Sequence, residues 1–145
     1  MIVEVHEVRD AFATVVGRLS GYTEWDGPFD PTAAPANVDL RPFSIAIPST
    51  SENGTRDRAG ATMDVVTRVV VRVHAPVHLA GPSRLAAATT EYKAEPLLIR
   101  ALMAQDGDWN RGMRVAYRST TREFLPVDEW LQTDHAFDVR HTVQL

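Results

Sequence analysis

The last third of the chain constrains the fold most, because it contains two long segments in which apolar and polar residues alternate. These segments, 114–123 and 133–145, are separated by a short linker. In the second segment, Phe137 and Val139 flank Asp138, and the same period of two continues on both sides. Such a period places successive side chains on opposite faces of a strand. We therefore expect an antiparallel pair of strands that ends the domain, with one covered face and one charged, solvated face.

Arginines recur on the expected polar face of this pair. Strict alternation in the first segment places Val115 and Tyr117 on the covered face. The polar face then receives four arginines, namely Arg114, Arg118, Arg122 and Arg140. Such a row could contact phosphates, but acidic residues are interleaved with it and no aromatic platform accompanies it. We favour a solvated or subunit-facing surface over a nucleic-acid groove.

Length and composition favour one soluble domain spanning residues 1–145. A chain of 145 residues that is 44% hydrophobic forms one core, which buries about 68–70% of the unfolded surface. Fifteen Lys and Arg against nineteen Asp and Glu give a net charge of −4, which disfavours a dedicated nucleic-acid binder. The absence of cysteine excludes disulfides, thiol catalysis and cysteine-based zinc sites. Neither a signal-peptide pattern nor a run of 18 apolar residues occurs, so we expect an unexported chain without a membrane span.

The first third predicts one helix followed by a loop. Apolar residues recur at steps of three and four over 3–19, which predicts an amphipathic helix that stops before Gly21. Residues 22–42 contain four prolines and have no steady period, so we expect a loop folded over the core, with Trp25 in it.

The middle of the chain predicts two strands, a long loop and a second helix. Segment 43–47 alternates between two prolines, which predicts a short strand closed at both ends. Segment 49–61 is polar or small throughout and predicts an exposed hairpin loop, mobile or ordered by a partner. Segment 62–75 alternates again and predicts the central strand. Segment 83–104 predicts a helix. Its expected buried seam consists of Leu85, Ala88, Tyr92, Ile99 and Leu102.

These elements give an α+β single domain in the order α-β-β-α-β-β. We expect a mainly antiparallel four-stranded sheet with both helices packed on one face.

The search for catalytic or metal-binding chemistry is mostly negative. His74 and His78 straddle a proline at a strand end, about 13 Å apart along a strand, which is a poor metal pair. His135 and His141 share a strand face but are separated by about 20 Å, and His141 is expected to be a satisfied histidine at the edge of the core. Acidic residues at the same end, Asp128, Glu129 and Asp134, are interpreted as solvated turn charges. The sequence has no Gly-x-Ser-x-Gly, glycine-rich phosphate loop or His-Glu-x-x-His motif, so we expect no enzyme, metal or cofactor.

A resemblance to a known family adds to this interpretation. In order and pattern, the elements at 3–19, 63–75, 83–104 and 114–130, with the ending 137–145, resemble the tail terminator (tail completion) proteins of long-tailed bacteriophages. The resemblance covers nearly the whole chain but includes no invariant motif. It implies an α/β subunit of a hexameric ring that sits on the head-proximal end of the tail tube, stops tube growth and joins the tail to the head connector or stopper protein. It implies no catalytic residues, and a virion component assembled in the host cytoplasm whose lumen passes DNA without specific binding.

On that resemblance, the loops and the arginines become candidate contacts between subunits, because Arg–carboxylate pairs across subunits fix register. The candidate interface or lumen residues are Trp25, Arg56, Arg58, Arg68, Arg72, Arg114 and Arg118. Two alternatives stay open. One is another head–tail neck or minor tail protein. The other is a small ligand-binding or hydrolytic α/β domain that combines His135 or His141 with Asp134 or Asp138.

Overall fold

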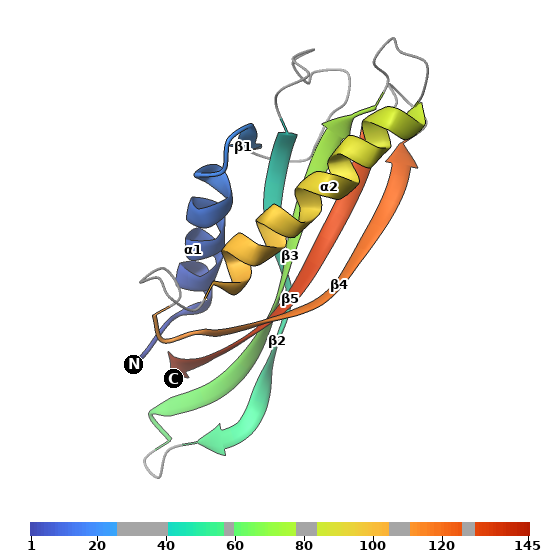
Figure 1. Ribbon diagram of the computed structural model, residues 1–145. Coiled ribbons are helices and arrows are strands. Elements are labelled where there is room, and N and C mark those ends of the chain that lie inside the picture. The colour runs from blue at the N-terminus through green and yellow to red at the C-terminus, as the bar shows by residue number, and fades with distance from the viewer. Residues whose placement is uncertain (26–40, 57–59, 78–83, 105–110, 126–129) are drawn as a thin grey trace.

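Five strands form one twisted sheet against which two helices lie (Figure 1). The computed structural model describes residues 1–25, 41–56, 60–77, 84–104, 111–125 and 130–145. The elements in chain order are α1 (Val5–Gly17), β1 (Tyr22–Glu24), β2 (Arg41–Arg56), β3 (Thr62–Pro76), α2 (Arg84–Met103), β4 (Arg114–Leu125) and β5 (Trp130–Gln144). The order of strands across the sheet is β1-β2-β3-β5-β4.

The sheet is mixed and five-stranded, so the prediction of a mainly antiparallel four-stranded sheet missed one strand. Residues Tyr22–Glu24, expected in a loop, form β1 and pair in parallel with the start of β2. Backbone bonds on both sides of β1 fix this pairing, because Arg41 N–H donates to Gly21 at 2.6 Å and Trp25 N–H donates to Phe43 at 2.7 Å. Gly21 has a φ of 85°, which lets the chain turn sharply from α1 into β1.

Strand β2 does not end at Pro48, and most of the expected loop 49–61 is strand instead. β2 continues to Arg56 and pairs with β3, for example Ser49 with Arg68 and Glu52 with Val65. The register shifts between Ala46 and Ser49, which marks a bulge around Pro48. A bulge leaves its extra residue outside the ladder, so the missing N–H of Pro48 costs the sheet no hydrogen bond.

Strand β3 is the central strand, as predicted, because it pairs with β2 on one side and β5 on the other. Its odd-numbered residues Val65, Val69, Val71 and Val73 are buried, and the even-numbered residues face the other way. The alternation in β5 is confirmed in the same manner, with Phe137 completely buried.

The prediction that Arg122 lies on the open face was wrong. β4 pairs with β5 in regular register up to Tyr117, opposite Phe137, but the next pair is Ser119 with Ala136. Arg118 is therefore an extra residue, and the alternation of β4 reverses after it. As a result Arg122 lies on the helix-covered face.

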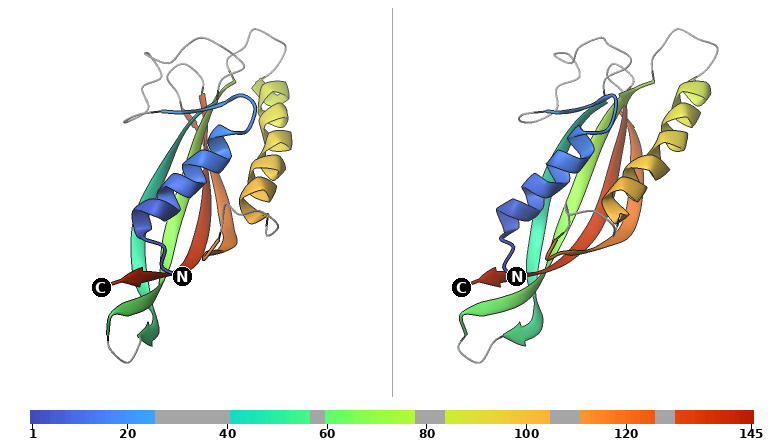
Figure 2. Two further views of the ribbon diagram at one scale, coloured as in Figure 1. Left: turned by 90° about the vertical axis from the view of Figure 1, so that its left-hand side faces the viewer. Right: turned by 60° about the vertical axis from the view of Figure 1, so that its left-hand side comes forward.

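Both helices cover the same face of the sheet, as predicted (Figure 2). One core cluster joins the two helices to the buried side of β2, β3, β4 and β5. From α1 it receives Val8, Phe12 and Val16, and from α2 it receives Leu98 and Leu102. The carboxylate of Glu7 accepts the Glu4 N–H at 2.6 Å and caps the start of α1.

The predicted seam of α2 is confirmed at Ala88 and Leu102, which are buried, and at Ile99, which is half-buried. Tyr92 was misplaced, because it is 38% exposed, and the side chain of Leu85 lies outside the described residues. The seam instead includes Glu95, which is buried because it faces Arg122 of β4.

Candidate functional site

The face of β3, β5 and β4 that points away from both helices carries most of the charged side chains of these strands, and we call it the arginine face. Strand alternation and register place its charged members together. They are Asp64, Arg68, Arg72, Arg114, Arg118, Glu123, Asp134, Asp138 and Arg140. Both helices lie on the other side of the sheet (Figure 2). Three adjacent long strands thus present a charged surface that no helix covers.

Two aspartates of β5 hold three of these arginines by ion pairs. Asp138 accepts from Arg68 Nε at 2.6 Å and contacts Arg118 Nε at 3.2 Å through its other oxygen. Asp134 receives a two-point contact from Arg72, at 2.8 and 2.9 Å. This hydrogen bond is the main cause of the raised pKa of Arg72. Because all three arginines are substantially exposed, these pairs orient the guanidiniums more than they stabilise the fold.

Arg114 and Arg140 differ from the other arginines of this face, because they lie directly opposite each other on β4 and β5. Both are exposed, and neither has an ion pair or side-chain hydrogen bond within the described part of the chain. Like charges directly opposite in an antiparallel pair are destabilising. The subunit therefore carries an unfavourable pair that a carboxylate or another oxyanion would relieve.

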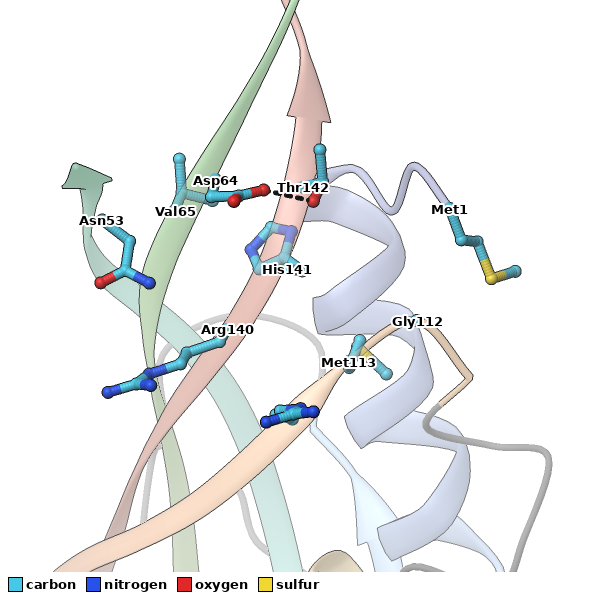
Figure 3. A pocket seen from close by; sticks show the side chains of 10 residues that line it. Met1, Asn53, Asp64, Val65, Gly112, Met113, Arg140, His141 and Thr142 are labelled. Atoms are coloured by element: carbon cyan, nitrogen blue, oxygen red, sulfur yellow. Dashed lines mark hydrogen bonds between the residues drawn. The ribbon is translucent and has the colours of Figure 1, made fainter. Parts of the chain in front are cut away.

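Two hollows adjoin this arginine pair. The larger one, about 540 Å³, lies where β4 begins, beside Asn53, Asp64 and the N-terminal segment (Figure 3). The carboxylate of Asp64 in this hollow already accepts a hydrogen bond from the Thr142 hydroxyl at 2.7 Å. A second hollow of about 300 Å³ runs between both arginines, Arg118 and Asp138. Charged side chains line both hollows, which fits contact with another surface better than enclosure of a small molecule.

The histidines of β5 lie on the opposite face from the aspartates with which a hydrolytic site would combine them. His141 is buried among core residues, where its Nδ1 donates to the Val3 carbonyl at 2.6 Å and its Nε2 contacts the Thr67 hydroxyl at 2.7 Å. Thr67 in turn contacts the Thr50 hydroxyl at 3.0 Å. The expectation of a satisfied core-edge histidine agrees with this geometry, which ties the N-terminal segment to the sheet.

His135 is likewise part of an internal chain of hydrogen bonds. Its Nδ1 contacts the Thr120 hydroxyl at 2.8 Å, and that hydroxyl contacts the Tyr117 hydroxyl at 2.6 Å. Burial lowers the pKa of His135 to about 4, although the negative charge of Glu95 acts in the opposite direction, so the imidazole is neutral at pH 7. The reactive pairing of histidine with aspartate is therefore not assembled at either position.

His74, which the sequence made a poor metal ligand, is buried and bonded to Gln132 at 3.1 Å, and burial lowers its pKa. Its sequence neighbour His78 lies outside the described residues, as do Asp128 and Glu129. Among the residues that the structure describes, no group of three or more potential metal ligands occurs, and no helix is long and apolar enough to cross a membrane.

The candidate interface residues separate into two groups. Arg68, Arg72, Arg114 and Arg118 come together on the arginine face. Trp25 follows β1, at the opposite edge of the sheet from β4, and is half-buried. The backbone of Arg56 ends β2 opposite Met63, while Arg58 lies outside the described residues. The candidates are thus not one surface.

Sequence reasoning left Arg140 out of the candidate interface set, although it noted the residue on the polar face. The signal was its place in the alternating run of β5. The sequence does not specify the register between β4 and β5, which places Arg140 opposite Arg114.

Comparisons with known proteins add little. No family model matches the chain, and no curated protein matches it. Among solved structures, it is similar to a chain of the "Virion of native gene transfer agent (GTA) particle", with 17% sequence identity and a TM-score of 0.43 over 89% of this chain and 82% of that chain. A similarity this low carries no functional argument, so the function is inferred from the residues themselves.

Proposed function

We propose that the chain is a structural protein of a phage-like virion, and specifically a tail terminator. In this role it forms a ring of six copies on the head-proximal end of the tail tube, stops tube growth and offers a surface to the head connector or stopper protein. Proteins of this kind act by presenting surfaces rather than by turning over a substrate, and we include the absence of enzymatic activity in the proposal.

One observation carries the proposal, and it is the arginine face. An open face of three long strands carries exposed, oriented guanidiniums, and two of them lack an acceptor in the described part of the subunit. Charged rows of this kind select partners and fix register when they meet carboxylates on another surface. The order of helices and strands, which resembles the terminator family, supports the same assignment.

The histidine–aspartate alternative is weaker on geometry. His135 and His141 point to the helix-covered side, whereas Asp134 and Asp138 are held by arginines on the other side. Adjacent residues of one strand face in opposite directions, so no rotamer change brings these groups together.

Negative-stain imaging and light scattering of the purified chain, alone and mixed with the tail tube protein of the same phage, test the proposal. We expect rings of six, or particles that cap one end of each tube and limit its length. Binding elsewhere in the neck, without any effect on tube length, would favour another neck or minor tail protein. A monomer that ignores the tube would overturn the proposal.

A further inference from the structure

We propose that the Arg114–Arg140 pair binds carboxylates on the outer side of α1 and β1 of a second copy of this chain, so that copies join head to tail. The inference rests on the proposed function, since it names which surfaces meet within the ring.

The first step is the charge of the arginine end of the sheet. Around the paired arginines lie Arg68 and Arg118, which share the single carboxylate of Asp138. The only other described carboxylate lining the adjoining hollows is Asp64, which is bonded to Thr142. Four guanidiniums thus stand against two carboxylates, an excess of two positive charges.

The second step is a matching acidic surface, which we call the acidic stripe and define as Glu7, Asp10 and Glu24. The single guanidinium of Arg9 contacts both Asp10, at 2.9 Å, and Glu24. Three carboxylates against one guanidinium leave an excess of two negative charges, equal and opposite to that of the arginine end. The side chain of Asp10 is 64% exposed and open to a partner.

The third step is shape. A hollow of about 250 Å³ between α1 and β1 is lined by Arg9, Asp10, Ala13, Thr14 and Glu24. It can receive a long side chain that ends in a planar guanidinium, which would share the two rim carboxylates, Asp10 and Glu24, with Arg9. The exposed side chains of Arg114 and Arg140 have the length to enter such a hollow.

The two surfaces face in opposite directions. α1 lies on the helix-covered face, whereas Arg114 and Arg140 flank the open face, so the two surfaces lie on opposite sides of the sheet (Figure 2). Each copy therefore offers one surface to the copy before it and the other to the copy after it. Such a head-to-tail contact closes into a ring or continues as a filament, in contrast to a two-fold dimer. The net charge of −4 favours this partner over nucleic acid.

Disulfide trapping tests the inference cleanly, because the chain has no cysteine of its own. Ala116→Cys lies in the hollow beside both arginines, and Thr14→Cys lies in the acidic hollow, so neither substitution removes a charge. The two single variants are mixed at low salt and oxidised. We expect the yield of the mixed disulfide to exceed that of either homodimer. This yield should fall at least about tenfold when Ala116→Cys also carries R114E and R140E. It should fall by a similar factor when the salt concentration is raised to 1 M. Adding Asp10→Arg to Thr14→Cys is expected to restore part of the loss caused by the reversed arginines.

The control is Lys93→Cys, at an exposed position on α2, mixed in turn with Ala116→Cys and with Thr14→Cys. Neither mixture should give more mixed disulfide than homodimer. For the charge reversal, K93E with R100E makes the same change of charge on α2 and should leave trapping unaltered.

The outcomes separate this inference from the proposed function. If the wild-type chain forms rings or caps tubes but Ala116→Cys pairs no better with Thr14→Cys than with the control, the inference fails and the terminator proposal stands. A dominant Ala116→Cys homodimer would also overturn it, in favour of a two-fold contact. Binding of a duplex oligonucleotide that R114E and R140E abolish, without preferred trapping, would assign the arginine pair to phosphate. No rings, no capping and no trapping would remove both proposals.

Discussion

Arg122 of β4 and Glu95 of α2 form a two-point ion pair, with Nε to Oε1 at 2.8 Å and Nη2 to Oε2 at 2.5 Å. The side chain of Glu95 is only 10% exposed, whereas that of Arg122 is 41% exposed and also lies over the ring of Tyr92. The pair exists because the bulge at Arg118 turns the second half of β4 over. It fastens the outer strand of the sheet to α2.

Arg122→Ala is expected to destabilise the fold by about 1–3 kcal/mol, because it leaves the buried carboxylate of Glu95 without its partner. The measurement is urea unfolding at pH 7. The matched control is Arg72→Ala, whose partner Asp134 stays more exposed, and it should cost less than about 1 kcal/mol. Equal losses for the two variants would contradict the structural role of the bulge.

Phe137→Ala is expected to cost about 3–5 kcal/mol, because Phe137 is completely buried and meets the rings of Phe12 and Tyr117 edge-on at 5.6 and 5.7 Å. Thermal and urea unfolding measure the loss. Leu97→Ala, at a position 62% exposed on α2, serves as control and should change stability by less than about 0.5 kcal/mol. A loss much under 1 kcal/mol for Phe137→Ala would mean that the buried face of β5 is misassigned.

Stability is expected to fall as the pH drops from about 6.5 to about 4, because of His135. An unfolded histidine binds its proton near pH 6.5, but burial lowers the pKa of His135 in the fold to about 4. Between these values the unfolded chain binds a proton that the folded chain does not, so acid favours unfolding. Above pH 6.5 the group costs nothing, and below pH 4 its penalty no longer grows.

The full penalty corresponds to roughly 3 kcal/mol, from about 2.5 pKa units at 1.36 kcal/mol each. Urea unfolding at a series of pH values from 7.5 to 4 measures it in the wild type and in His135→Gln. The variant should lose this part of the pH dependence and keep the contribution of other groups, including His74. Parallel pH profiles for the two proteins would show that His135 titrates normally.

Thr67→Val is expected to cost about 1–3 kcal/mol, because it removes the hydroxyl between Thr50 and His141 and leaves a buried ring nitrogen without its partner. Thr50→Val is the control, since Thr50 is exposed and its loss leaves the Thr67 contact to His141 intact. Hydrogen exchange at Val3, whose N–H donates to Thr142 at 2.9 Å, reports on the N-terminal segment. Unchanged hydrogen exchange at Val3 and unchanged stability in Thr67→Val would show that these hydrogen bonds do not hold the N-terminal segment to the sheet.

Charge reversal of Arg56 and Arg58 to Glu is expected to weaken assembly with itself or with the tube while unfolding stays unchanged. The reason is that the terminator proposal assigns these two cations to an interface, where reversed charges would repel the arginine-binding carboxylates of a partner. Light scattering and tube capping measure assembly, and circular dichroism checks the fold. Undiminished association would remove the end of this hairpin from the interface.

The sequence predicted the elements where one strong period runs through a segment. The central strand, the two closing strands, both helices and their common face followed from periods of two and of 3.6, because burial of one side imposes that spacing directly.

The predictions were wrong where pairing with a neighbouring strand overrode a local sequence preference. Pro48 predicts the end of a strand. Because Pro48 lies at a bulge, the ladder does not need its missing N–H, and β2 stays paired with β3 as far as Arg56. Residues Tyr22–Glu24 are too short to show a period and become a strand only because β2 lies beside them.

By itself, the sequence determined the alternation that makes one sheet face apolar and the other charged. Only the tertiary structure decided which charges meet. Register set Arg114 against Arg140, and one extra residue at Arg118 moved Arg122 from the open face to the carboxylate of Glu95. The physical reason is that the period of a strand is a property of its own residues, whereas register and bulges depend on the neighbouring strand, which no local pattern specifies.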